Sequence, residues 1–132
     1  MSDGTPTSLR TALGRVRGLG SAKSGTEHWW LQRLTSVALI PLTLWFAISV
    51  ISLVGAPYEE VRAWLARPWS AVLMILMLVA TFHHAAAGMQ VIYEDYIHSH
   101  WLRLAVDLAT KGLAFLLAAY GVVAVLKIAF GG

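Results

Sequence analysis

The chain has no cysteine and few charged residues for its length of 132 residues. The absence of cysteine excludes a disulfide scaffold, a zinc finger, an iron–sulfur site held by this chain and a thiol nucleophile. Charged residues make up 13% of the sequence, against roughly 25% in soluble globular domains, and hydrophobic residues make up 58%. These proportions exclude an ordinary soluble domain and predict an integral membrane protein.

The charges that are present leave three long gaps. No Asp, Glu, Lys or Arg occurs at 34–58, 68–93 or 112–126. A helix of about 20 apolar residues crosses a bilayer, so the first two gaps are long enough by themselves. The third gap is shorter, so Lys111 and Lys127 must extend toward the membrane surfaces or face protein. We predict an all-α integral membrane fold with three transmembrane helices at about 34–54, 69–93 and 104–130.

A polar N-terminal segment precedes the membrane domain. Residues 1–23 are rich in Gly, Ser, Thr and Arg, and they lack the apolar run of a secretory signal peptide. We interpret them as a flexible cytoplasmic tail, although their composition also resembles a mitochondrial transit peptide. Residues 24–132 form the predicted three-helix transmembrane anchor domain.

Positive charge is concentrated on one predicted side of the membrane, and Lys and Arg in short flanks favour the cytoplasmic side. The N-terminal flank and the loop after the second span carry these residues, namely Arg15, Arg17, Lys23, Arg33 and Arg103. We therefore expect a multi-pass protein of the bacterial inner membrane with a cytoplasmic N-terminus. The mitochondrial inner membrane is the less favoured location. Orientation in the membrane also explains the net charge of +3, so we expect no nucleic-acid binding.

Two local patterns lie outside the centres of the predicted spans. In residues 58–67, Val61, Trp64 and Leu65 recur at helical spacing on one side, which predicts a short amphipathic helix on the membrane surface. At the start of the third span, Asp107 and Lys111 lie four residues apart, so their side chains can pair along a helix.

Two adjacent histidines, His83 and His84, lie within the second predicted span, where ionisable side chains are costly and usually face protein or a cavity. Adjacent residues point about 100° apart on a helix, so both cannot bind one ion from one face. His84 has Gly88 one turn further along the same face, which leaves room for a flat macrocycle, and imidazole is a common axial ligand of haem. Alternatively, the small residues let helices pack closely, and the residues alone leave these interpretations balanced.

Arg33 and Tyr96 are candidate binding residues near the membrane surface. Arg33 either anchors the first span, which its position favours, or faces inward toward a bound carboxylate or phosphate. Tyr96 lies where the second span ends, about 18 Å from His84 if the helix is continuous. Its hydroxyl can bind a quinone carbonyl, although interfacial tyrosines are more commonly plain membrane anchors. No obvious second haem ligand occurs in spans one or three, so it would come from another subunit.

The spacing of His84-x3-Gly88 followed by Asp95-Tyr96 resembles the hydrophobic membrane anchor subunits of succinate dehydrogenase, or complex II. The segment His28-Trp29-Trp30-Leu31-Gln32-Arg33 resembles the start of that family's first helix. Three spans of this length are also typical of the family. The resemblance covers about residues 24–130.

The resemblance implies a subunit that helps pass electrons from succinate oxidation to ubiquinone in the tricarboxylic acid cycle and respiratory chain. Its helices would pack with a cytochrome b556 subunit, and haem b would be shared between that subunit and His84 as an axial iron ligand. Arg33 and His28 would lie near the haem, and Tyr96 and Asp95 would bind ubiquinone. The iron–sulfur and flavoprotein subunits would be further partners, and this chain alone would not be catalytic. The alternatives are a fumarate reductase anchor and a purely structural assembly subunit without haem.

Overall fold

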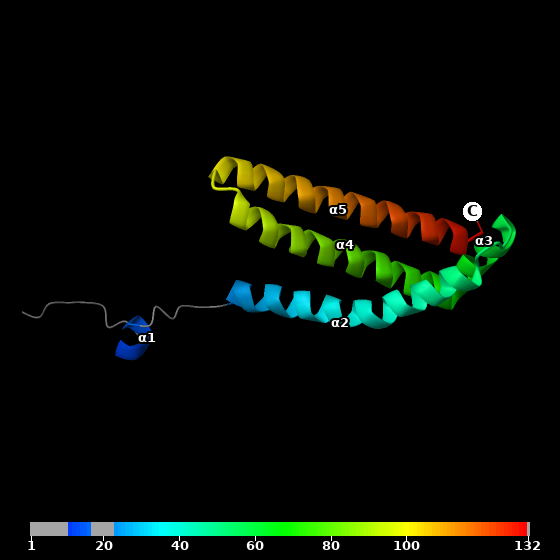
Figure 1. Cartoon of the computed structure of the whole chain (residues 1–132), viewed down its shortest axis with the longest axis horizontal. Helices are drawn as coiled ribbons and strands as arrows, with labels where there is room; N and C mark the ends of the chain where they lie inside the picture. The colour runs from blue at the N-terminus through cyan, green and yellow to red at the C-terminus, as the bar shows by residue number, and fades with distance from the viewer. Residues whose placement is uncertain (1–10, 17–22, 132) are drawn as a thin grey trace, which may run out of the picture. The chain divides into compact units, whose positions relative to one another are not determined.

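The structure is a computed structural model that describes residues 11–16 and 23–131 (Figure 1). Within these ranges the chain forms helices joined by short connections and contains no strand. The helices are α1 (Ala12–Val16), α2 (Lys23–Ser52), α3 (Tyr58–Ala66), α4 (Pro68–Tyr96) and α5 (His100–Ala129). The predicted all-α fold is therefore confirmed.

Three of these helices are long and apolar enough to cross a membrane, at Thr26–Ser52, Pro68–Tyr96 and His100–Ala129. The number of membrane helices agrees with the prediction. The helices that carry the first and third predicted spans begin at Lys23 and His100, before the spans themselves. A helix satisfies its own backbone hydrogen bonds, so it continues through the headgroup layer while carrying charged side chains.

The N-terminal part of the chain belongs to a separate unit. The structure divides into Met1–Trp30 and Leu31–Gly132, and helix α2 runs from the first unit into the second. Most of the tail predicted at 1–23 lies outside the described residues; the described part of it includes α1, and its last residue, Lys23, begins α2. The flexibility of this tail stays a prediction.

Helices α4 and α5 pack side by side as an antiparallel pair (Figure 1). The buried residues on α4 are mostly small, and small side chains let two helix backbones approach closely; they are Ser70, Ala71, Ala80, Ala87 and the larger Tyr93. On α5, a Cβ added at Gly121 would lie only 3.0 Å from a methyl carbon of Leu78. Close packing of α4 on α5 thus sets where the ends of these helices lie.

Arg103 fixes the turn between α4 and α5. Its Nε and Nη2 donate hydrogen bonds to the carbonyl oxygen of Ile97, at 3.1 and 2.7 Å. Ile97 follows the last residue of α4, so the guanidinium places positive charge at the carboxyl end of the helix, where the helix dipole favours it. The last turn of α4, which carries Asp95 and Tyr96, is therefore held against α5.

The short helix α3 connects α2 to α4 and packs against both α4 and α5. Its Trp64 ring stacks on Trp45 of α2, with ring centroids 5.7 Å apart. Val61, Trp64 and Leu65 are partly buried, whereas Glu59 and its acidic neighbour are exposed. The helix and its apolar side are therefore as predicted.

Candidate functional site

His84 lies on α4 with its ring directed at two hydroxyl groups of α2. Its Nδ1 atom is 3.4 Å from Thr35 Oγ1 and 3.5 Å from Ser36 Oγ, and the side chain is partly buried. The neighbouring His83 is exposed. The expected divergence of the two histidines is confirmed, and His84 is the one that contacts a second membrane helix.

Both hydroxyl groups also bond to the backbone of their own helix. Ser36 Oγ donates to the Gln32 carbonyl oxygen at 2.7 Å. Thr35 Oγ1 lies 2.9 Å from the Leu31 carbonyl oxygen and 3.1 Å from that of Gln32. Such bonds to the preceding turn are a normal way for Ser and Thr to satisfy their protons within a helix. Each oxygen keeps acceptor capacity for a further hydrogen bond.

The surroundings of His84 contain open space and one unsatisfied polar atom. A Cβ added at Gly88, one turn from His84, would meet no heavy atom within 4 Å. Among the described residues, Gln32 Oε1 is a buried side-chain oxygen without a hydrogen-bond partner. Gln32 lies one turn before Thr35 and Ser36 on α2. A further group bound beside His84 therefore has room next to Gly88, and a buried acceptor lies one turn from the hydroxyl pair.

Arg33 and His28 lie on α2, which also carries the hydroxyl pair. Arg33 is two residues before Thr35, and its side chain is exposed. His28 is exposed as well and belongs to the unit that ends at Trp30. The predicted roles of both residues near a haem stay predictions.

Tyr96 and Asp95 lie in the last turn of α4, and both side chains are exposed, Tyr96 by 79%. Helix α4 is continuous from His84 to Tyr96, so the condition for the predicted spacing of about 18 Å is met. A large aromatic side chain exposed at the end of a membrane-length helix is available to a ligand or a partner.

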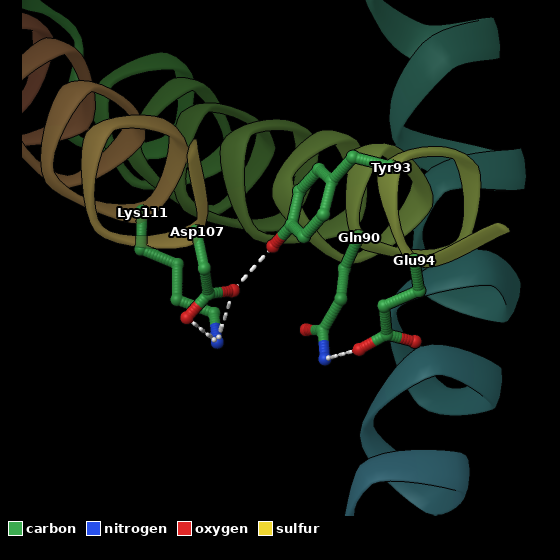
Figure 2. Close-up of polar contacts among 5 residues, drawn as sticks. All are labelled: Gln90, Tyr93, Glu94, Asp107 and Lys111. Carbon is green, nitrogen blue, oxygen red and sulfur yellow. Dashed lines mark hydrogen bonds and ion pairs between the residues drawn. The ribbon is translucent and has the colours of Figure 1, made fainter. Parts of the chain in front are cut away.

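A polar network holds α4 against α5 one turn before Tyr96 (Figure 2). The hydroxyl of Tyr93, which is only 5% exposed, donates a hydrogen bond to Asp107 of α5. Lys111 Nζ lies 2.9 Å from one carboxylate oxygen of Asp107 and 3.0 Å from the other. The predicted pairing of Asp107 with Lys111 is confirmed, whereas the contribution of Tyr93 was not predicted.

Thr35 and Ser36 are site residues that the sequence interpretation did not single out. A histidine inside a span needs a hydrogen-bond partner from the same protein or from a neighbour. The signal that could have identified them is that two adjacent hydroxyl residues occur in the first span. Their contact with His84 depends on how α2 faces α4, which the periodicity of either helix alone does not reveal.

Known proteins are similar to this chain over most of its length. Residues 7–126 match the family described as succinate dehydrogenase/fumarate reductase transmembrane subunit. The succinate dehydrogenase hydrophobic membrane anchor subunit of Rickettsia bellii is 32% identical over 117 residues, which cover 89% of this chain and 94% of the relative. The subunit of the same name from Rickettsia conorii is 34% identical over 96 residues, covering 72% of this chain and 76% of the relative.

A relative from a different genus carries the same name as these two. The succinate dehydrogenase hydrophobic membrane anchor subunit of Paracoccus denitrificans is 35% identical over 81 residues, which cover 61% of this chain and 63% of the relative. The family match includes α4 and all but the last residues of α5, and therefore His84, Asp95 and Tyr96. The chain belongs to the family of succinate dehydrogenase/fumarate reductase transmembrane subunits.

Proposed function

We propose that this chain is the hydrophobic membrane anchor subunit of a succinate dehydrogenase, complex II. Three membrane-length helices and relatives that carry this name over most of the chain support the proposal. The subunit helps pass electrons from succinate oxidation to ubiquinone and binds no dicarboxylate itself. The names of the relatives favour succinate oxidation over the fumarate reductase alternative.

His84 is the proposed axial ligand of haem b. The observation that carries this assignment is that Nδ1 faces Thr35 and Ser36, which leaves Nε2 as the ring nitrogen for an external ligand. The space beside Gly88 suits a flat macrocycle. The described residues contain no cluster of three His, Cys, Asp or Glu side chains, so a single imidazole suits a metal whose other ligands come from elsewhere. Bound haem would supply one-electron redox chemistry.

A partner, the cytochrome b556 subunit, would supply the other ligand to the haem iron. Arg33 fits a role near the haem because a guanidinium binds carboxylates such as the haem propionates with a planar fork, and His28 is assigned to the same edge. Helices α2 and α5 expose large apolar side chains, among them Val37, Ile40 and Phe115. These faces suit lipid and the helices of the cytochrome b556 subunit.

Tyr96 and Asp95 are the proposed ubiquinone-binding residues of this chain. The Tyr96 hydroxyl donates a hydrogen bond to a quinone carbonyl, and Asp95 supports the same site. The Arg103 contact with Ile97 positions this end of α4. By the distribution of positive charge this end faces the cytoplasm, where the iron–sulfur and flavoprotein subunits dock on the bacterial inner membrane.

Absorbance spectroscopy of the purified complex tests the haem assignment. His84→Ala should remove or strongly weaken the reduced-minus-oxidised haem b spectrum, because the iron loses an axial ligand from this chain. His83→Ala is the matched control, since His83 is adjacent but exposed, and it should keep a normal spectrum. A normal spectrum in the His84→Ala complex would contradict the assignment. A wild-type complex without haem would favour the purely structural alternative.

A further inference from the structure

We infer that Thr35 and Ser36 are positioning residues for His84: their hydroxyl oxygens accept a hydrogen bond from its Nδ1–H and hold the imidazole in the tautomer with the lone pair on Nε2. The inference rests on the proposed function, in which Nε2 binds the haem iron. The haem assignment alone gives these two residues of α2 no role, whereas here they position the His84 imidazole.

The direction of the hydrogen bond follows from the positions of the hydroxyl protons. Each hydroxyl has one proton, and the bond from Ser36 to the Gln32 carbonyl is 2.7 Å long, in the usual range for O–H···O bonds. The bond from Thr35 to the Leu31 carbonyl is 2.9 Å long. Both are much shorter than the contacts to Nδ1 at 3.4 and 3.5 Å, so the protons point at the carbonyls.

Only a protonated Nδ1 satisfies this arrangement. An unprotonated Nδ1 would place its lone pair against the lone pairs of two oxygens, which is repulsive. A protonated Nδ1 instead donates to both, and in a neutral imidazole the other nitrogen then carries the free lone pair. Since the His84 ring nitrogen is nearly equidistant from the oxygens of Thr35 and Ser36, the pair restrains rotation of the ring as well as its tautomer.

This contact has a consequence for the ligand strength of His84. A hydrogen bond from the distal N–H of a ligating imidazole makes the ring a better electron donor and fixes its orientation. Better donation stabilises oxidised iron, so the hydroxyl pair lowers the haem midpoint potential and raises haem affinity. Two hydroxyl groups that only packed α2 against α4 would not affect the midpoint potential of haem that is fully bound.

The test uses the assembled complex with the full-length chain. Thr35→Val combined with Ser36→Ala removes both acceptors, while Thr35→Ser keeps both. Ser49→Ala is the matched control because Ser49 is also on α2 and its hydroxyl bonds to the Trp45 carbonyl at 2.7 Å, about 20 Å along the helix from Thr35. Haem content, the midpoint potential from a redox titration, and the electron paramagnetic resonance spectrum of oxidised haem are measured for each.

In the double variant, haem affinity should fall about 10–100-fold, and the midpoint potential of the haem that remains bound should be higher than in the wild type. Thr35→Ser and Ser49→Ala should match the wild type. If the double variant does not assemble, Thr35→Val and Ser36→Ala are measured singly, and each should raise the potential by a smaller amount.

Two outcomes separate the inference from the proposed function. If His84→Ala loses its haem spectrum but removal of the hydroxyls, together or singly, leaves potential and resonance spectrum unchanged, the inference is wrong and the haem assignment stands. If His84→Ala keeps a normal haem, both are wrong. An equal shift of the midpoint potential in Ser49→Ala would also overturn the inference, because any hydroxyl removed from α2 would then change the potential.

Discussion

Tyr93→Phe removes a single hydroxyl from the network that joins α4 to α5. The phenylalanine ring keeps the packing of a side chain that is only 5% exposed, so the change isolates the hydrogen bond to Asp107. Hydrogen bonds to charged groups contribute about 1.5–3 kcal/mol in soluble proteins. Interhelical bonds in membranes average about 0.6 and reach about 1.7 kcal/mol. Because Tyr93 is buried and its acceptor is charged, we expect a loss of about 1–1.7 kcal/mol.

Substitutions of Asp107 and Lys111, the other two members of the network, should lower the free energy of unfolding by amounts that differ from the effect of Tyr93→Phe. Asp107→Ala removes the acceptor and leaves the buried Tyr93 hydroxyl unsatisfied, which costs about 1–3 kcal/mol in addition to the lost ion pair. Lys111→Met removes only an ion pair whose side chains are 52% and 26% exposed, and exposed pairs contribute about 0–1 kcal/mol. The expected order of destabilisation is therefore Asp107→Ala, then Tyr93→Phe, then Lys111→Met.

Denaturant unfolding of the full chain in detergent micelles, followed by circular dichroism, measures these free energies. In a double-mutant cycle, Tyr93→Phe should be neutral or stabilising once Asp107 is alanine, because it removes the buried hydroxyl that has lost its acceptor. Equal destabilisation by Lys111→Met and Asp107→Ala would contradict the expected order. An equal effect of Tyr93→Phe with and without Asp107 would show that the two side chains are not coupled.

Two further predictions concern the quinone site and the helix interface. Tyr96→Phe should lower succinate-dependent ubiquinone reduction, while succinate-dependent reduction of a soluble dye persists. Tyr58 is an exposed tyrosine at the start of α3, so Tyr58→Phe is the control and should change neither rate. Unchanged quinone turnover in Tyr96→Phe would remove Tyr96 from the site. Gly121→Val should destabilise the α4–α5 pair by about 1–3 kcal/mol in the same unfolding assay, because its Cβ would meet Leu78 at 3.0 Å. Gly112→Val, where a Cβ meets nothing within 4 Å, is the control, and an equal loss there would contradict the packing argument.

The elements of the fold were predictable because they depend on local patterns. Uncharged apolar runs determined the three membrane helices, and the period of Val61, Trp64 and Leu65 determined α3. The pairing of Asp107 with Lys111 is also local, since four residues separate them on one helix. The helices extend beyond the predicted spans because charge marks the edge of the apolar layer, whereas the helix itself continues beyond that edge.

Contacts between helices were the part that sequence patterns could not supply. His84 was identified from its position in a span, but its partners Thr35 and Ser36 lie 49 and 48 residues earlier in the chain. Tyr93 likewise occurs in a segment with several polar residues, and nothing in its spacing distinguishes it as the partner of Asp107. Which faces of two helices meet depends on packing over their whole length, including small residues far from the polar contact.

In the proposed function, this chain anchors a succinate dehydrogenase and helps hold its haem. The most direct measurement is the absorbance spectrum of the complex purified through an affinity tag on this chain, recorded before and after addition of succinate. A b-type haem spectrum should be present, and succinate should reduce at least part of it. A complex without haem absorbance, or one whose haem is not reduced by succinate, would contradict the proposed function.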